Sequence, residues 1–177
     1  MTSTKTTSGS GASTSAFGAE WSDVANAAAI DGTTSVSIDA GGGEGTDTLS
    51  RTDWGFSIPS AATILGVSVS VKHRRAETDA NSYLQLTHGG NSLGSARTLT
   101  NLPTSAGFST DSAGGASDLW GASLTPGIVN ASSFGVLYRA DVGTPSDAVE
   151  VDGFQITVHY VEGGVRTRTV SRRGLGP

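Results

Sequence analysis

The sequence predicts an all-β protein, an antiparallel β-sandwich of the jelly-roll kind, with a flexible arm at each end. Apolar and polar residues alternate with a period of two in five separate segments. Clusters of glycine, aspartate, asparagine and serine separate these segments, as turns do. Of the 177 residues, 36% are hydrophobic and only 15% are charged, which favours an ordered core over a disordered chain. We expect one sandwich domain over residues 16–162.

The five alternating segments are the expected strands. In each of them, one set of side chains faces the core and the other set faces water or a partner. The segments span residues 35–38, 67–72, 83–87, 134–139 and 149–160.

The last segment contains a change of parity. Val149 and Val151 occupy odd positions, whereas the apolar residues from Phe154 to Tyr160 occupy even positions. Asp152-Gly153 lies at the change. A β-bulge at this point would let both halves face inward, because glycine tolerates the required geometry.

Turns and loops are expected between the segments. Asp31-Gly32 and Gly89-Gly90-Asn91 are typical of hairpin turns. Pro59 is expected to end the short apolar stretch before it, because proline cannot donate to a central ladder. Long loops are expected at residues 41–48 and 103–117.

The two ends of the chain are expected to lie outside the domain. Residues 1–15 are rich in serine, threonine and glycine, which predicts a flexible arm. Residues 15–162 carry 6 basic and 16 acidic residues, a net charge of −10, whereas residues 163–177 are basic. We expect the C-terminal arm to lie on the acidic body of a neighbouring copy. Its four arginines are Arg166, Arg168, Arg172 and Arg173.

Composition excludes several classes of site. The absence of cysteine excludes disulfides and thiolate metal sites. No apolar stretch approaches the roughly 20 residues of a membrane span, so no membrane partner is expected. The first residues lack the apolar core of a secretory signal. The acidic body disfavours nucleic acid as a partner.

No motif predicts catalysis, a metal site or a cofactor. His73, His88 and His159 stand outside HxH, HxxxH and GxSxG settings, so we expect surface histidines and no catalytic residue. Calcium binding is an alternative for two loops, but solvated turn acids are the default interpretation and no metal is expected. The candidate calcium ligands are Asp39, Glu44 and Asp47 in one loop and Asp141 and Asp147 in the other.

Tryptophans are the candidates for a sugar-binding surface. Trp21, Trp54 and Trp120 each lie near an expected strand end, where a tryptophan more often closes the end of a sandwich. Trp54 and Phe56 share parity with Ile58, which favours the core for both. The alternative is that Trp54 and Trp120 face a carbohydrate ligand.

Five short motifs follow one another along the chain. They are Trp21 with Asn26-Ala27, GFSIP with the following GVSVSV over residues 55–71, DLWG over 118–121, NASSFGV over 130–136 and VDGFQITVHY over 151–160. Taken in this order, they resemble a β-sandwich domain of structural proteins of tailed bacteriophages and prophages. The resemblance covers about residues 17–161 and carries over no catalytic residue.

The resemblance implies a component of a virion. Short arms and the lack of a coiled coil differ from a receptor-binding fibre and suit a protein that docks on the capsid, neck or tail. We therefore expect a non-enzymatic structural protein, located in the virion, that assembles with other virion proteins and with itself as a trimer or ring. The alternative is a carbohydrate-binding module for host attachment on the virion surface. A glycan hydrolase would need two facing acids, and the sequence selects no such pair.

Overall fold

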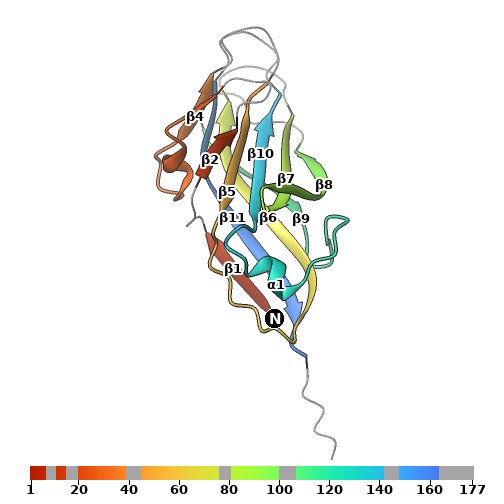
Figure 1. Ribbon diagram of the computed structural model, residues 1–177. Coiled ribbons are helices and arrows are strands. Elements are labelled where there is room, and N and C mark those ends of the chain that lie inside the picture. Colours follow the sequence, from red (N-terminus) through yellow and green to blue (C-terminus); the bar gives the residue numbers. More distant parts are fainter. Residues whose placement is uncertain are drawn as a thin grey trace, which may run out of the picture.

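The chain forms a sandwich of two antiparallel sheets, which confirms the predicted fold class (Figure 1). The structure is a computed structural model, and it describes residues 1–6, 11–14, 20–38, 45–75, 81–99, 107–141 and 148–163. The basic segment with Arg166, Arg168, Arg172 and Arg173 lies outside the described residues.

One sheet has six strands, which are β1 (Thr2–Thr6), β3 (Trp21–Ser22), β4 (Ser35–Ile38), β6 (Thr63–Arg75), β9 (Ser109–Gly114) and β11 (Ala148–Val161). Their order is β3-β4-β11-β6-β9, and β1 pairs with β11. The long strand β11 is central. It pairs with β6 along one side and with β4 and then β1 along the other (Figure 1).

The second sheet has five strands, which are β2 (Gly11–Thr14), β5 (Thr48–Thr52), β7 (Ser82–His88), β8 (Asn91–Leu99) and β10 (Gly135–Ala140). Their order is β2-β5-β10-β7-β8. Two single-turn helices complete the described part, a 3-10 helix η1 (Val24–Ala27) and α1 (Pro126–Val129). Neither these helices nor any other described segment is a helix long and apolar enough to cross a membrane.

The core lies between the two sheets and follows the predicted alternation. Val67, Val69 and Val71 of β6 are fully buried, and so are the inward residues of β7 and β10. Aromatic rings meet edge to face at the centre, where Tyr138 lies 5.9 Å from both Trp21 and Phe154 between ring centroids. Such pairs stabilise a core beyond the area that they bury.

The bulge predicted at Asp152-Gly153 is present. The register of β11 against β6 shifts between Val151 and Gly153, and the extra residue, Asp152, is fully buried. Its Oδ1 accepts hydrogen bonds from the backbone N–H groups of Asp31 and Gly32, at 2.9 and 3.0 Å. Its Oδ2 lies 2.6 Å from the Lys72 ammonium nitrogen. The bulge therefore places the Asp152 carboxylate where it binds the backbone of the turn at residues 31–32.

The expected flexible arm over residues 1–15 is wrong for the described residues there. Thr2–Thr6 forms β1 on the edge of β11, and Gly11–Thr14 forms β2 on the edge of β5. Threonine is favoured in strands, and an open sheet edge supplies the hydrogen-bond partners that an isolated polar segment lacks. The composition of residues 1–15 is typical of a flexible segment, and composition does not reveal that a sheet edge is available for such a segment to pair with.

The loop expected at residues 103–117 is also wrong in part, because Ser109–Gly114 forms strand β9. Its side chains alternate between half-buried and exposed, so the strand has no apolar face to detect. The other expected loop, 41–48, runs into β5 at Thr48, and its first residues, 41–44, lie outside the described residues. The stretch before Pro59 belongs to no strand, although Phe56 and Ile58 are buried.

Candidate functional site

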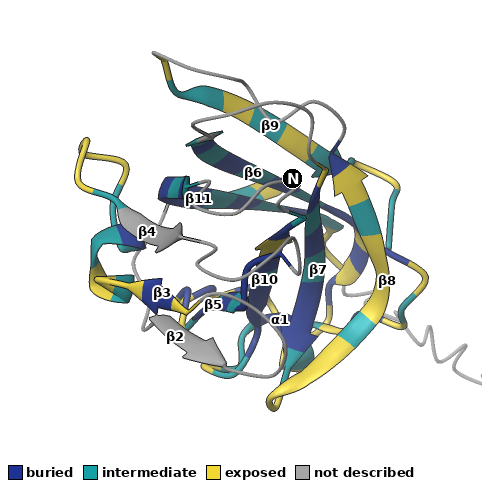
Figure 2. Ribbon diagram, turned by 90° about the horizontal axis from the view of Figure 1, so that it is seen from above, coloured by how far each residue is buried: buried dark blue, intermediate teal, exposed yellow. Residues whose placement is uncertain are grey.

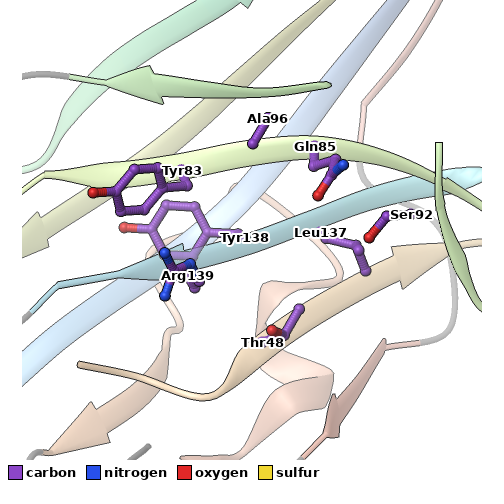
Figure 3. Close-up of a pocket in the computed structure, with 8 residues that line it drawn as sticks. All are labelled: Thr48, Tyr83, Gln85, Ser92, Ala96, Leu137, Tyr138 and Arg139. Atoms are coloured by element: carbon purple, nitrogen blue, oxygen red, sulfur yellow. The ribbon is translucent and has the colours of Figure 1, made fainter. Parts of the chain in front are cut away.

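A pocket of about 240 Å³ lies on the outer face of the five-stranded sheet, and we call it the sheet pocket (Figure 3). Four neighbouring strands, β5, β10, β7 and β8, contribute to it. The residues that line it are Thr48, Tyr83, Gln85, Ser92, Ala96, Leu137, Tyr138 and Arg139.

Strand alternation sets which side chains reach the sheet pocket. Every second residue of β7 and β10 is buried in the core, so the residues between them point outward. The register places Gln85 opposite Leu137 and Tyr83 opposite Arg139. These two pairs are direct cross-strand neighbours, close enough for their side chains to touch. Tyr138, whose side chain is fully buried, also borders the pocket.

Strand β8 forms a side wall of the sheet pocket. Its pairing with β7 shifts between Leu84 and Leu86, and Gly94 within the shifted stretch has φ +72°, which favours glycine. The Gln85 side-chain amide donates to the Gly94 carbonyl oxygen at 2.8 Å. β8 therefore curves, with most of its residues exposed (Figure 2), and Ser92 and Ala96 reach the pocket from it.

Three side chains form a cluster at one end of the sheet pocket. The Arg139 guanidinium carbon lies 4.6 Å from the centroid of the Tyr83 ring. The Tyr83 hydroxyl donates to Oδ2 of Asp141 at 2.6 Å, and Nη1 of Arg139 lies 4.0 Å from Oδ1 of the same carboxylate. The hydrogen bond to Asp141 is the main cause that raises the pKa of Tyr83, followed by burial and by the Asp141 charge. Tyr83 is therefore a neutral phenol held at a fixed angle.

The tryptophans do not face a ligand. Trp21, Trp54 and Trp120 are at most 5% exposed. Each indole N–H donates to a backbone carbonyl, at 2.8 to 3.1 Å, as buried tryptophans require. Trp54 and Trp120 are therefore buried in the core and present no exposed ring to a carbohydrate in this structure.

The expectation that all three histidines lie at the surface is wrong for His73. Its side chain is fully buried, with Nδ1 2.9 Å from the Tyr138 hydroxyl and Nε2 2.9 Å from Oδ2 of Asp111. Burial lowers the pKa of His73, and the neighbouring Asp111 offsets only part of this effect. His88 and His159 are half-exposed, and Nε2 of His159 lies 3.0 Å from the Ser68 hydroxyl.

The candidate calcium ligands do not come together in the described part of the chain. Asp39, Glu44 and Asp147 lie outside the described residues. Asp47 is buried, and Asp141 holds the Tyr83 hydroxyl. Among the residues that the structure describes, no group of three or more histidine, aspartate or glutamate side chains is placed to hold a metal ion.

Sequence reasoning missed the residues of the sheet pocket. It sought ligand contacts among the tryptophans, which are the largest aromatic side chains. The usable signal was the set of outward-facing residues in the expected strands 83–87 and 134–139. This set combines aromatic, amide, apolar and charged groups, which are Tyr83, Gln85, Leu137 and Arg139. The contribution of β8 carried no such signal, because no alternation marks that strand and Ala96 lies in its irregularly paired stretch.

Comparison with known proteins gives structural neighbours only. The sequence matches no protein-family profile and no curated protein. The similar solved structures include β-sandwich carbohydrate-binding modules and a phage tailspike domain. One is the enzymatically active domain of tailspike protein 4 from bacteriophage CBA120, with TM-score 0.45, 9% identity and 90% of this chain covered. Another is the CBM22-1 xylan-binding domain of Xyn10C from Paenibacillus barcinonensis, with TM-score 0.40, 14% identity and 91% covered.

The lengths covered differ among these neighbours. The chain spans 19% of the tailspike chain and 21% of a glycoside hydrolase domain of Endo-D from Streptococcus pneumoniae R6, but 94% of the xylan-binding domain. At TM-scores below 0.5, this likeness bears on neither activity nor ligand.

Proposed function

We propose that this chain is a glycan-binding module without catalytic activity and that the sheet pocket is its binding site. The observation that carries the proposal is the chemistry of the pocket lining. An aromatic ring, an apolar side chain and several hydroxyl and amide groups converge there on the outer face of paired strands.

This lining suits a sugar, which presents both C–H surfaces and hydroxyl groups. Leu137 and the edge of Tyr83 offer apolar contact. Ser92 offers a hydroxyl that can both donate and accept, and Gln85 retains an amide oxygen that accepts, since its amide nitrogen donates to Gly94. Because these groups stand on paired strands, little conformational entropy is lost when a ligand binds.

The size of the sheet pocket suits a short ligand segment. Its volume of about 240 Å³ is just below the roughly 300–1,000 Å³ of typical small-molecule sites. One sugar unit, or the end unit of a longer glycan, would occupy the pocket.

Binding is tested by isothermal titration calorimetry against a panel of soluble neutral and acidic glycans. Gln85→Ala removes a pocket side chain, and Gln155→Ala is the matched control on the outer face of the other sheet. Losing one hydrogen-bonding group costs about 1.4 kcal/mol, or tenfold in Kd. We expect that loss for Gln85→Ala and wild-type affinity for Gln155→Ala.

A second variant separates binding from local structure. Ala96→Trp adds a bulky side chain at an exposed position of β8 that lines the sheet pocket. It removes no described hydrogen bond, so it should keep the fold and abolish binding. A wild-type protein that binds no glycan, or an Ala96→Trp protein that binds as well as wild type, would contradict the proposal.

The non-catalytic part of the proposal has its own test. Bound glycans are incubated with the protein and their chain lengths are compared by size-exclusion chromatography before and after. We expect no change. The appearance of shorter products that scale with protein concentration would instead identify an enzyme.

A second candidate function is that of a structural virion component, which docks on the capsid, neck or tail of a tailed phage and assembles with copies of itself. The position of β1 favours it. Within the described residues, β1 pairs on one side only, with β11. Its outer side offers backbone donors and acceptors to a strand of another chain. A module that binds host glycans on a virion surface would combine both functions.

Assembly is tested by the mass of the full chain from light scattering. A trimer or ring is expected, and replacing Arg166, Arg168, Arg172 and Arg173 together by serine should dissociate it if these arginines pair with the acidic body of a neighbour. A monomer at every concentration for both proteins would contradict self-assembly.

A further inference from the structure

Arg139, at one end of the sheet pocket, has unused hydrogen-bonding capacity. Its side chain is 53% exposed. Among the described residues its nearest charged partner is Asp141, at 4.0 Å, which is too long for a hydrogen bond. The five N–H donors of the guanidinium are therefore available to a ligand.

The guanidinium is nevertheless held in place. It lies over the Tyr83 ring, with its carbon 4.6 Å from the ring centroid, and such a cation–π contact contributes about 0.5–1 kcal/mol at an exposed site. The ring is itself fixed by the hydrogen bond from the Tyr83 hydroxyl to Asp141. Stacking leaves the edges of the planar guanidinium free, and these edges match a carboxylate with two parallel hydrogen bonds.

We propose that the sheet pocket selects glycans that carry a carboxylate, on a uronic or a sialic acid unit, and that Arg139 binds this carboxylate. The inference rests on the glycan-binding function proposed above. Ser92 and the amide oxygen of Gln85 would then bind hydroxyls of the same sugar unit.

The charges around the sheet pocket are consistent with this selectivity. Arg139 is the charged residue among the eight that line the pocket, since the pKa values of Tyr83 and Tyr138 are raised and both are neutral at ordinary pH. Asp141 does not line the pocket. Its carboxylate accepts a hydrogen bond from the Tyr83 hydroxyl. A ligand carboxylate therefore meets the Arg139 guanidinium directly, while Asp141 weakens its binding at longer range.

The experiment compares ligands that differ in the carboxylate alone. Oligogalacturonate is compared with its methyl ester, and sialyllactose is compared with the methyl ester of its own carboxyl group. These two arms distinguish a uronic from a sialic acid source. We expect the wild-type protein to bind the acid form of at least one pair at least tenfold more tightly than the neutral form, with a preference that declines as salt is added.

Three variants locate the preference. Arg139→Gln should reduce the ratio of acid to neutral affinity to about one. Arg139→Lys keeps the charge but loses the planar fork, and should retain only part of the ratio. Asp141→Asn keeps an oxygen that accepts from the Tyr83 hydroxyl while removing the negative charge, so it should tighten binding of the acid form several-fold.

The outcomes separate the two proposals. If wild type binds acid and neutral forms equally, the carboxylate selectivity is wrong and the glycan-binding function stands. If Arg139→Gln retains the wild-type ratio, Arg139 is not the carboxylate partner. If the folded protein binds no glycan of either kind, both proposals fail together. Circular dichroism and thermal unfolding of each variant establish that it is folded.

Discussion

The indole nitrogen of Trp120 donates a hydrogen bond of 2.8 Å to the carbonyl oxygen of Val67. This contact ties the turn that follows β9 to the middle of β6. The carbonyl of Trp120 in turn accepts from the Ser95 amide at 2.7 Å, which anchors the bulged part of β8. One fully buried side chain and its backbone therefore join both sheets at the side of the sandwich where β8 walls the sheet pocket.

Trp120→Ala is expected to lower the free energy of unfolding by about 3–5 kcal/mol, the usual cost of a large cavity in a core. Trp120→Phe keeps most of the volume but leaves the Val67 carbonyl without its donor, and should cost about 1–3 kcal/mol. Urea denaturation followed by fluorescence measures both. An alanine variant no less stable than the phenylalanine variant would contradict the packing described here.

Gly114 lies at the end of β9 with φ +77°. A Cβ there would meet the Val67 carbonyl oxygen and the Trp120 ring. Gly89, in the β7–β8 turn, also has a positive φ, +62°, but open space around it. Gly89→Ala should therefore cost only the backbone strain, about 1–2 kcal/mol.

Gly114→Ala should cost clearly more than Gly89→Ala, because Val67 and Trp120 must also move. Thermal unfolding of the two variants side by side measures the difference. Equal melting temperatures would show that the close packing around Gly114 yields without cost.

His73 makes stability depend on pH, because burial holds its pKa below the ordinary value of 6.5. Below about pH 6.5 the unfolded chain binds a proton at this residue before the folded protein does. The free energy of unfolding should therefore fall as the pH drops from 6.5 to the lowered pKa of the folded state, and be insensitive to His73 above 6.5.

His73→Gln keeps a polar side chain between Tyr138 and Asp111 but does not titrate. Urea denaturation at intervals between pH 5 and 8 should show a smaller slope for this variant than for wild type. Identical slopes would mean that His73 is protonated equally in both states.

Asp152 stabilises the turn at residues 31–32 through two backbone hydrogen bonds and an ion pair with Lys72. Asp152→Ala leaves two N–H groups without their acceptor and Lys72, whose side chain is 31% exposed, without its partner, so it should cost about 1–3 kcal/mol. Asp152→Asn keeps an oxygen acceptor and should cost less. Denaturant midpoints compare the two, and an asparagine variant as unstable as alanine would assign the whole effect to the charge.

The sequence predicts the strands correctly where one face of the strand is fully buried. Val67, Val69 and Val71 alternate with serine and lysine, and the same alternation exposed the bulge at Asp152-Gly153. It failed for Ser109–Gly114 and Thr2–Thr6, which are edge strands. Their small polar residues pair with a neighbour through the backbone, and backbone pairing leaves no periodic apolar signal.

The candidate site was harder to predict than the fold. The Arg139–Tyr83 contact depends on the register of β10 against β7, and a sequence does not reveal register between strands more than fifty residues apart. His73 was placed at the surface because a histidine near a strand end gives no sign of a buried tyrosine partner such as Tyr138 on the opposite sheet.

The placement of β11 also governs how the chain folds. Every residue of β1 pairs with a residue of β11 that lies more than 145 positions later in the sequence. Strands β4 and β6 also pair with β11 and cannot do so before it is available. During synthesis, the ribosome releases β11 after all other described strands. The six-stranded sheet can therefore close only after β11 has been synthesised, through contacts of very high contact order that slow folding. Until then the open edges of β4 and β6 are exposed to other nascent chains, which makes slow, dilute expression the favourable regime for this protein.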